Sequence, residues 1–355
     1  MTVPAAAPAL GDFGQAIERI DFVRRSPFAL GGARHHKEWQ HFVVLSAELD
    51  LLVNFSYCDD ARPRALQGAE FPRLVLLLRE RGWDGDVEQF AMAEATSRGG
   101  RIDLTFGGNR LRFHDGRFLI AVALRERPIT VELALAPVTQ PAYVPSIPML
   151  DGPPLNWVVV PRLQVRGVVT VAGRRYQLDG APAYHDHNWG HFLWGHDVSW
   201  EWGFVLPESE TVPWCLTFVR LTDRARTRAL AQQLLLWRGA HLLALFRECD
   251  LEAEAELVHL RPAQVFKVPR VMALVAPECS TDVPRSYEVR ARARGDWLTC
   301  RCTGSDMAQV VIPSETRLGV TIFNEVSARA SVQGCIDGER VEFCGRSILE
   351  FIRDY

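Results

Sequence analysis

Apolar and polar residues alternate along much of this chain, and a period of two is the pattern of strands with one buried face. The alternation is clear on both sides of Gly107-Gly108-Asn109, with apolar residues at positions 102, 104 and 106 before this turn and at 111 and 113 after it. It returns at 118–122 and 165–178. The pattern predicts a mainly β fold built from hairpins.

Three other segments depart from this pattern. Phe13, Ile17 and Ile20 have helical spacing, and we also predict a helix in 229–237, both helices being peripheral. Residues 133–150 carry no charge and are long enough to be tested as a membrane span. Prolines at 137, 141, 145 and 148 would break such a helix repeatedly, so an extended connector is predicted.

Two pairs of segments resemble each other at nearly one offset, which indicates duplicated domains. Glu38-Trp39-Gln40-His41-Phe42 is echoed by Glu201-Trp202-Gly203-Phe204, about 163 residues later, and Gly173-Arg174-Arg175-Tyr176 by Gly338-Glu339-Arg340-Val341, 165 residues later. Chance similarity between hairpins is the alternative. We expect tandem β domains at 1–196 and 197–355. Because Glu38 and Glu201 stand at matched positions of the repeat, we expect these two glutamates to have a structural role. Closed barrels of about eight strands have no free edges and can hold one apolar ligand.

Composition narrows the class of protein. The chain has 355 residues, is 48% apolar and has a formal charge of -3, which argues against a nucleic-acid partner. Residues 1–10 lack a basic start followed by an apolar segment, so we expect a cytoplasmic protein whose eight cysteines are mostly reduced.

Residues 184–202 concentrate the groups that carry chemistry. Four of the 10 histidines and four of the 10 tryptophans fall between 185 and 202. No ordinary strand needs this density. The usual fingerprints of a serine hydrolase elbow, a phosphate-binding loop or a dinucleotide site do not occur in the sequence.

The segment Tyr184-His185-Asp186-His187-Asn188-Trp189-Gly190, followed by Trp200-Glu201-Trp202-Gly203, resembles the carotenoid 1,2-hydratase family and its AttH-like, lipocalin-type relatives. Similar segments at 39–42 and 345–355 extend the resemblance over most of the chain. It implies an all-β fold of two tandem lipocalin-like antiparallel barrels with minor helices. It also implies a hydrophobic isoprenoid, terpenoid or polyene substrate and no cofactor, with hydration, cyclisation and pericyclic reactions all represented.

The resemblance links Tyr184 and Asp186 with activity. The hydratases also carry an aromatic residue with a histidine two positions before it. Trp157 matches the aromatic residue, but Leu155 stands where the histidine would be. If the motif is a strand, Tyr184, Asp186 and Asn188 share one face, and His185, His187 and Trp189 share the other.

Asp186 is the expected general acid, because an apolar cavity raises the pKa of a carboxyl group. Tyr184 would orient it, and His187 and Asn188 would complete the polar network. Aromatic faces can stabilise a carbocation, and we expect the cavity walls to include Trp157, Trp189, Trp194, Trp200 and Trp202. Peripheral contact with a membrane surface stays open, because an apolar substrate can be collected from a bilayer.

Several alternatives stay open. Asp186 with its neighbours is also typical of a satisfied hydrogen-bond network at a domain junction. The tryptophans are likewise typical of ordinary core and interface packing. His185 and His187 with His191 or His196 would suit a catalytic metal, but no carboxylate occurs at a matched spacing, and we predict none. A non-catalytic lipid or terpenoid binder and a shape-driven pericyclase are the alternative functions.

Overall fold

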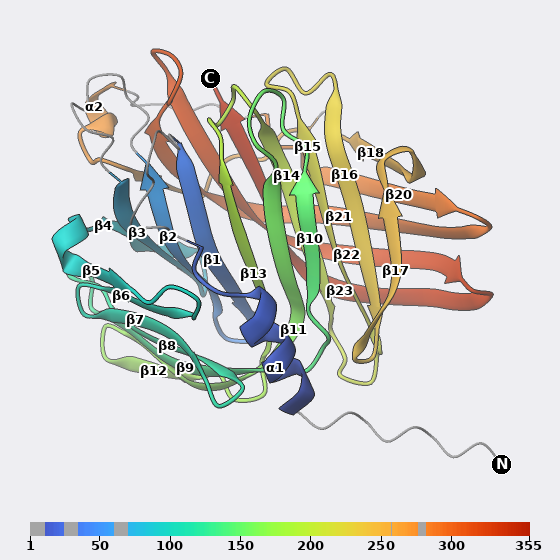
Figure 1. Ribbon diagram of the computed structural model, residues 1–355, viewed down its shortest axis with the longest axis horizontal. Helices are drawn as coiled ribbons and strands as arrows, with labels where there is room; N and C mark the ends of the chain where they lie inside the picture. Colours follow the sequence, from blue (N-terminus) through green and yellow to red (C-terminus); the bar gives the residue numbers. More distant parts are fainter. Residues whose placement is uncertain (1–10, 25–34, 60–69, 257, 276–281) are drawn as a thin grey trace.

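The computed structural model describes residues 11–24, 35–59, 70–256, 258–275 and 282–355. Residues 1–10, from which a cytoplasmic location was predicted, lie outside the described residues, and so does Cys279. The described chain is dominated by strands, as the alternation predicted (Figure 1). The helices are α1 (Gly11–Ile20) and α2 (Met272–Val275).

The first of two sheets contains β1 (His36–Leu45), β2 (Asp50–Asp59), β3 (Glu70–Arg79), β4 (Trp83–Gln89), β5 (Ala95–Ser97), β6 (Asp103–Phe106), β7 (Asn109–His114), β8 (Arg117–Ala123), β9 (Ile129–Pro137), β10 (Ala142–Ile147), β11 (Leu155–Val171), β12 (Arg174–Gln177) and β13 (Pro182–His191). Its order is β4-β3-β2-β1-β13-β11-β9-β8-β7-β6-β5, with β10 and β12 paired to β11. Strands β5 to β9 and β12 curl away from β1 to β4 (Figure 1).

The second sheet contains β14 (Ser199–Pro207), β15 (Trp214–Thr222), β16 (Ala229–Arg238), β17 (His241–Arg247), β18 (Leu251–Ala255), β19 (Gln264–Lys267), β20 (Ser286–Ala293), β21 (Asp296–Pro313), β22 (Val320–Ile336) and β23 (Glu339–Asp354). Its order is β17-β16-β15-β14-β23-β22-β21-β20-β18, with β19 on β21. Pairing is antiparallel in both sheets among the described strands, apart from β19 with β21.

The two sheets begin with the same strand order. In each, four consecutive strands form a meander, and the first of them pairs with the last strand of the sheet, β1 with β13 and β14 with β23. The echoed segments Glu38-Trp39 and Glu201-Trp202 lie on these equivalent strands, β1 and β14. The chain changes sheet between His191 and Ser199. The two-barrel architecture is as predicted, while independent domains divided at 196 and 197 stay a prediction.

The helix predicted at 229–237 is wrong, because these residues form β16. Leu235 and Trp237 pack into the apolar cluster between the sheets, and Leu234 and Leu236 into the core of the second sheet. A strand buried on both faces is apolar at consecutive positions, so its period of two is hidden. The helix predicted from Phe13, Ile17 and Ile20 is α1, and the extended segment predicted at 133–150 contains the end of β9 and all of β10.

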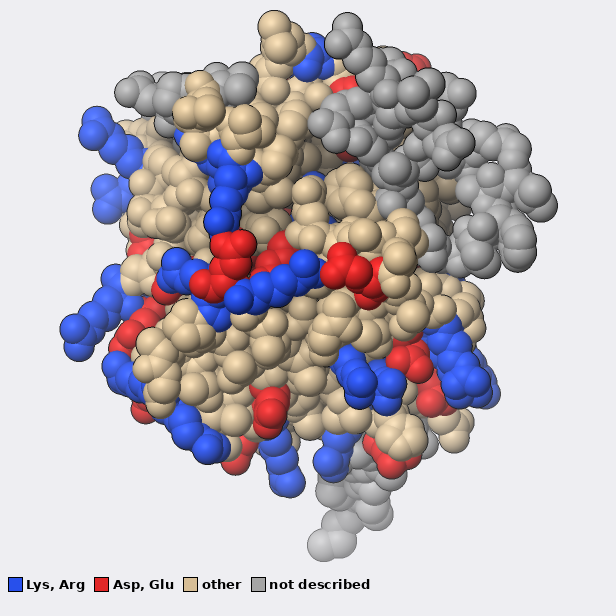
Figure 2. Space-filling view, turned by 90° about the vertical axis from the view of Figure 1, so that its left-hand side faces the viewer, with Lys and Arg blue, Asp and Glu red and all other residues tan. Residues whose placement is uncertain are grey.

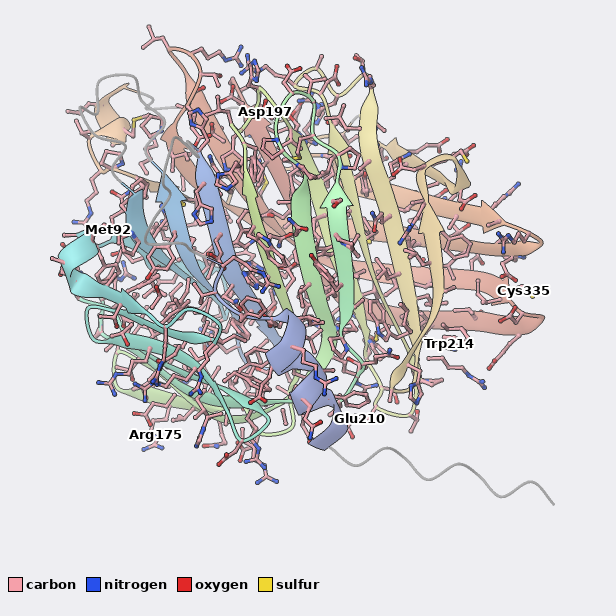
Figure 3. The ribbon with its side chains drawn as sticks, viewed as in Figure 1. Met92, Arg175, Asp197, Glu210, Trp214 and Cys335 are labelled. Atoms are coloured by element: carbon pink, nitrogen blue, oxygen red, sulfur yellow. The ribbon has the colours of Figure 1, made fainter. Side chains whose placement is uncertain are left out.

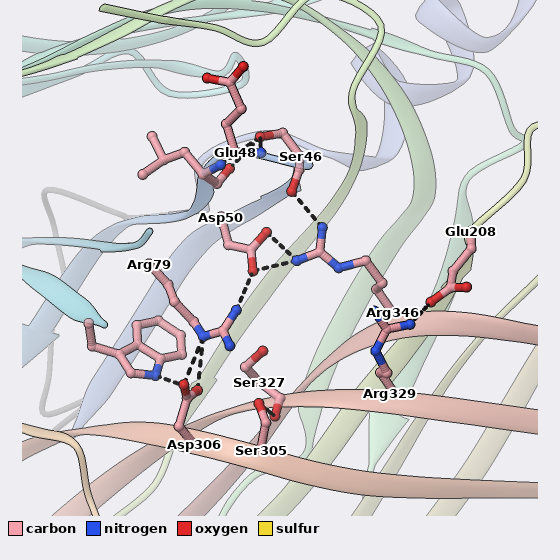
Figure 4. A network of polar contacts seen from close by, with 12 residues as sticks. Ser46, Glu48, Asp50, Arg79, Glu208, Ser305, Asp306, Ser327, Arg329 and Arg346 are labelled. Atoms are coloured by element: carbon pink, nitrogen blue, oxygen red, sulfur yellow. Dashed lines mark hydrogen bonds and ion pairs between the residues drawn. The ribbon is translucent and has the colours of Figure 1, made fainter. Parts of the chain in front are cut away.

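The two sheets face each other across an apolar layer and a set of ion pairs. Arg346 Nη2 lies 2.6 Å from Asp50 Oδ1, and Arg79 Nε lies 2.9 Å from Asp306 Oδ1, so each pair joins a residue of the first sheet to one of the second (Figure 4). The indole of Trp83 also donates to Asp306 Oδ1 at 3.1 Å. These contacts fix how the sheets sit relative to one another.

The outer face beside β4 carries basic and acidic side chains in close proximity (Figure 2). Arg127 pairs with Asp84, and Arg270 with both Asp86 and Glu126. Neither helix in the described residues has the length and apolar character needed to cross a membrane.

Candidate active site

Strand β13 lies in the middle of the first sheet, between β1 and β11, and its side chains alternate between two buried environments. His185 and His187 point into the core of the first sheet, and Tyr184, Asp186 and Asn188 point towards the second sheet. The alternation predicted from the sequence is therefore confirmed. All five residues are at most 2% exposed.

The histidine face is a closed polar network. His185 Nε2 and His187 Nδ1 each lie 2.8 Å from an oxygen of Asp21, which follows α1, and His187 Nε2 lies 2.9 Å from Glu38 Oε1. The remaining nitrogen of His185 lies 2.9 Å from the carbonyl oxygen of His41. Both ring nitrogens of each histidine are thus in use, which leaves no lone pair for a metal.

Asp21 and His187 form a buried ion pair. Burial raises the pKa of Asp21, but the charges and hydrogen bonds of His185 and His187 outweigh it and lower this pKa below its usual range. Burial likewise opposes charge on His187, yet Asp21 and Glu38 raise its pKa to about 9. His187 therefore serves this network and does not contact Asp186 by a hydrogen bond.

The opposite face of β13 holds the predicted acid. The Tyr184 hydroxyl donates to Asp186 Oδ2, and the Asn188 amide donates to Asp186 Oδ1, both at 3.0 Å. Burial raises the pKa of Asp186 to about 8; the hydrogen bond from Tyr184 opposes this shift, and the nearby Glu350 carboxyl adds to it. The predicted direction of the shift is confirmed, while a catalytic role for Asp186 stays a prediction.

Two further carboxyl groups face this site from the second sheet. Trp202, Glu350 and Glu325 are register partners across β14, β23 and β22, so their side chains form one row. Burial raises the pKa of both Glu325 and Glu350. The nearby Glu325 carboxylate raises the pKa of Glu350 further, and the charge of Asp186 adds to the rise at Glu325. Glu325 is 4% exposed, and its Oε2 has no hydrogen-bond partner in the described chain.

The row of acids opposes a row on the first sheet. Asp186, His41 and Asn54 are register partners across β13, β1 and β2. The imidazole of His41 meets the indole of Trp202 edge to face, with ring centroids 5.5 Å apart. Asn54 Nδ2 lies 3.3 Å from His41 Nδ1, and His41 Nε2 has no partner among the described residues.

Burial, with a smaller contribution from His185, lowers the pKa of His41 to about 3. His41 is therefore a neutral imidazole at physiological pH. With Asn54 donating to Nδ1, Nε2 carries the proton and can donate it to a bound oxygen atom.

A cavity of about 360 Å³ lies between the sheets, within the usual range for small-molecule sites. Residues of β1, β2 and β3 line it from the first sheet, and residues of β21, β22 and β23 from the second. Glu325, Glu350 and His41 border it, whereas Asp186 and Tyr184 do not. Glu350 also raises the pKa of Asp186, so it connects the motif electrostatically with the cavity.

The predicted tryptophan walls divide into three groups. Trp194 borders the cavity, and Trp39, which was not predicted, borders it too. Trp157, Trp200 and Trp202 are buried in the apolar layer behind it, where their indole groups act to lower the pKa of Asp186, Glu350 and Tyr184, respectively. Trp189 lies on the other face of β13, where it stacks on Tyr143 at 5.8 Å.

Sequence analysis missed Glu325, Glu350 and His41 as site residues. A usable signal existed for Glu350, which interrupts the apolar run 348–352, because an acid in a strand buried on both faces must be paired or protonated. His41 lies two residues after Trp39, on the same strand face. Nothing local marks Asp21 or the pairing of Glu325 with Glu350, since both depend on contacts between distant segments.

Among the residues that the structure describes, one group of potential metal ligands lies elsewhere. Asp151, His196 and Asp197 place ligand atoms within 4.8 Å of one another, with Asp197 near the upper ends of the strands in Figure 3. Asp151 and His196 are exposed. His196 was one of the histidines that could have completed a metal site with His185 and His187, and the structure does not bring it to them.

No protein-family model and no curated protein matches this sequence. Solved structures do resemble it. A putative AttH from Nitrosomonas europaea matches with a TM-score of 0.63 and 13% identity, covering 99% of this chain and 98% of that one. Kievitone hydratase from Nectria haematococca matches at 0.59 and 11%, covering 94% of each chain. CghA matches at 0.59 and 13%, covering 90% and 88%, and was also solved with Sch210972. These matches confirm the predicted double-barrel, AttH-like fold.

Proposed function

We propose that the protein is a cofactor-independent enzyme that adds water to, or rearranges, an unsaturated hydrophobic small molecule by acid catalysis in the cavity between the sheets. The observation that carries the proposal is the pair Glu325 and Glu350, whose raised pKa values leave a proton on carboxyl groups at the wall of a largely apolar cavity. An isoprenoid or terpenoid is the substrate class we favour. The names of two structural relatives, a hydratase and a protein solved with Sch210972, agree with a small organic substrate.

The chemistry follows from the two opposing rows. A protonated carboxyl of the Glu325 and Glu350 pair donates its proton to a carbon–carbon double bond, leaving a cation on the substrate. Aromatic faces of Trp39, Trp194 and Phe323 border the same cavity. Each such face can stabilise a desolvated cation by up to about 2 kcal/mol. The carboxylate left behind can then take a proton from an attacking water molecule, which gives hydration, or from the cation, which gives rearrangement.

His41 and Asp186 have supporting roles in this scheme. The Nε2–H of His41 can hold the oxygen of a water molecule or of a substrate hydroxyl at the cavity wall. Asp186 with Tyr184 and Asn188 lies behind Glu350 and holds a second proton, which limits negative charge next to the reacting pair. Asp186 is thus a positioning residue here, whereas the sequence predicted it as the acid itself.

The test is incubation with linear and cyclic terpenoids, followed by mass spectrometry for products that are one water heavier or isomeric. We expect Glu325→Gln and Glu350→Gln to lose product formation, and Glu210→Gln, at an exposed glutamate, to keep it. Normal turnover in both active-site variants would contradict acid catalysis by this pair and would favour a pericyclase in which cavity shape directs the reaction.

A non-catalytic terpenoid or lipid binder is the second candidate, and the apolar part of the cavity favours it equally. The two functions differ in one readout. A binder retains the apolar ligand unchanged in mass and chromatographic retention, and its affinity does not depend on protonated Glu325 and Glu350.

A further inference from the structure

The described lining of the cavity holds one charged side chain, Arg73, that has no acidic partner among the described residues. Arg73 lies on β3 with its side chain on the same face as Phe71 and Val75, and it is 8% exposed. Its Nε has no hydrogen-bond partner, and no carboxylate of the described chain forms an ion pair with it. Its guanidinium carbon lies over the ring of Phe71, 5.1 Å from the ring centroid, a cation–π contact that supplies no hydrogen-bond acceptor.

Every other charged group in the described lining of the cavity is balanced. Lys37 Nζ lies 3.0 Å from Glu315 Oε1 and also donates to the carbonyl oxygen of Phe192 at 2.6 Å. Glu325 and Glu350 face the same space with their protons retained, and His41 is neutral. The described part of the cavity wall therefore carries a net positive charge at Arg73.

A buried charge without a partner is costly, and folded proteins normally pair it. Arginine is also the side chain best suited to a planar anion, because its guanidinium presents parallel N–H donors that match the two oxygens of a carboxylate. The missing partner of Arg73 is then expected from a ligand. We propose that Arg73 binds the carboxylate of the substrate, so that the cavity selects apolar molecules carrying an acid group.

The strand register sets the length of such a molecule. Arg73 pairs with Ser56 and Ser56 with Trp39, one row along the sheet from the row of Asn54 and His41. Two strand spacings and a two-residue step place the Cα atoms of Arg73 and His41 about 12 Å apart. A chain anchored at Arg73 would thus extend along the cavity towards His41 and the acid pair.

The test is a binding measurement that needs no turnover. Farnesoate, methyl farnesoate and farnesol share one hydrocarbon chain, and only farnesoate carries the charge. Isothermal titration calorimetry at neutral pH on the full chain should show farnesoate binding at least about tenfold more tightly than the ester, the factor expected from one charge-assisted hydrogen bond. Arg73→Gln should abolish the preference, Arg73→Lys should keep part of it, and Arg110→Gln, at an exposed arginine of β7, should keep all of it.

The results separate this inference from the function on which it rests. Equal binding of farnesoate and its ester by the unsubstituted protein, or no binding of either, overturns the role of Arg73 whatever the variants do. A preference that survives in folded Arg73→Gln, checked by circular dichroism, overturns it as well. A preference that depends on Arg73, without any product, supports the carboxylate site and contradicts only the catalytic proposal.

Discussion

Replacing Asp186 by Asn should make the protein more stable at neutral and alkaline pH, which is unusual for a buried residue in a polar network. The folded-state pKa of Asp186 is raised to about 8, from an ordinary value of 3.8. Between these two pH values the folded chain holds a proton that the unfolded chain releases, so stability falls as pH rises. Asparagine has no proton to lose and resembles the protonated acid in shape.

The magnitude follows from the width of that window. Each pH unit costs the unsubstituted protein about 1.4 kcal/mol, so the contribution of Asp186 falls by about 6 kcal/mol between pH 4 and pH 8. The new amide can be accommodated, because Asn188 Oδ1 has no partner in the described chain and becomes an acceptor if its side chain flips. The gain of Asp186→Asn over the unsubstituted protein should therefore grow with pH and level off above pH 8.

Urea unfolding of both proteins at pH 5, 6, 7, 8 and 9, followed by circular dichroism, measures this difference in the free energy of unfolding. Asp115→Asn, at an exposed aspartate, is the matched control and should show a nearly constant difference across the series. Parallel curves for Asp186→Asn and the unsubstituted protein would mean that Asp186 is ionised at neutral pH. The reasoning that burial keeps its proton in place would then be refuted.

Two further predictions concern the supports of the site. The pKa of His187 is raised to about 9 from 6.5, so the stability due to its charged form is complete below pH 6.5 and is lost as pH rises through 9, by about 3 kcal/mol. Histidine-ring NMR should show a titration near pH 9 that moves to lower pH in Asp21→Asn. A midpoint near 6.5 in the unsubstituted protein would contradict this prediction. At the contact between the sheets, Asp50→Ala should lower the free energy of unfolding by about 2 to 3 kcal/mol, because it leaves Arg346 partly buried without its carboxylate partner. The double variant Asp50→Ala and Arg346→Ala should lose less than the sum of the single changes. Additive losses in a double-mutant cycle by urea unfolding would argue against a coupled pair.

Local sequence was enough to predict that the chain is mainly strand and that side chains alternate along β13. A period of two needs only neighbouring residues, so the two faces of Tyr184, His185 and Asp186 were predictable before any contact was known. The raised pKa of Asp186 was predictable for a similar reason, because an acid among tryptophans in a strand has little access to water. Residues 229–237 show the limit, since burial on both faces removes the alternation that identifies a strand.

The sequence by itself was enough to predict the two-barrel architecture, through a resemblance spread over most of the chain. It also predicted the faces on which the motif's side chains lie, because these follow from local periodicity. Only the tertiary structure decided which groups meet. Asp21 reaches His187 from 166 residues away, and Glu325 meets Glu350 through strand register. Packing of one sheet on the other, not local pattern, placed the cavity against Glu350 and Arg73 and left Asp186 behind its wall. Burial and partner choice set the protonation of these groups, and both are properties of the assembled sheets.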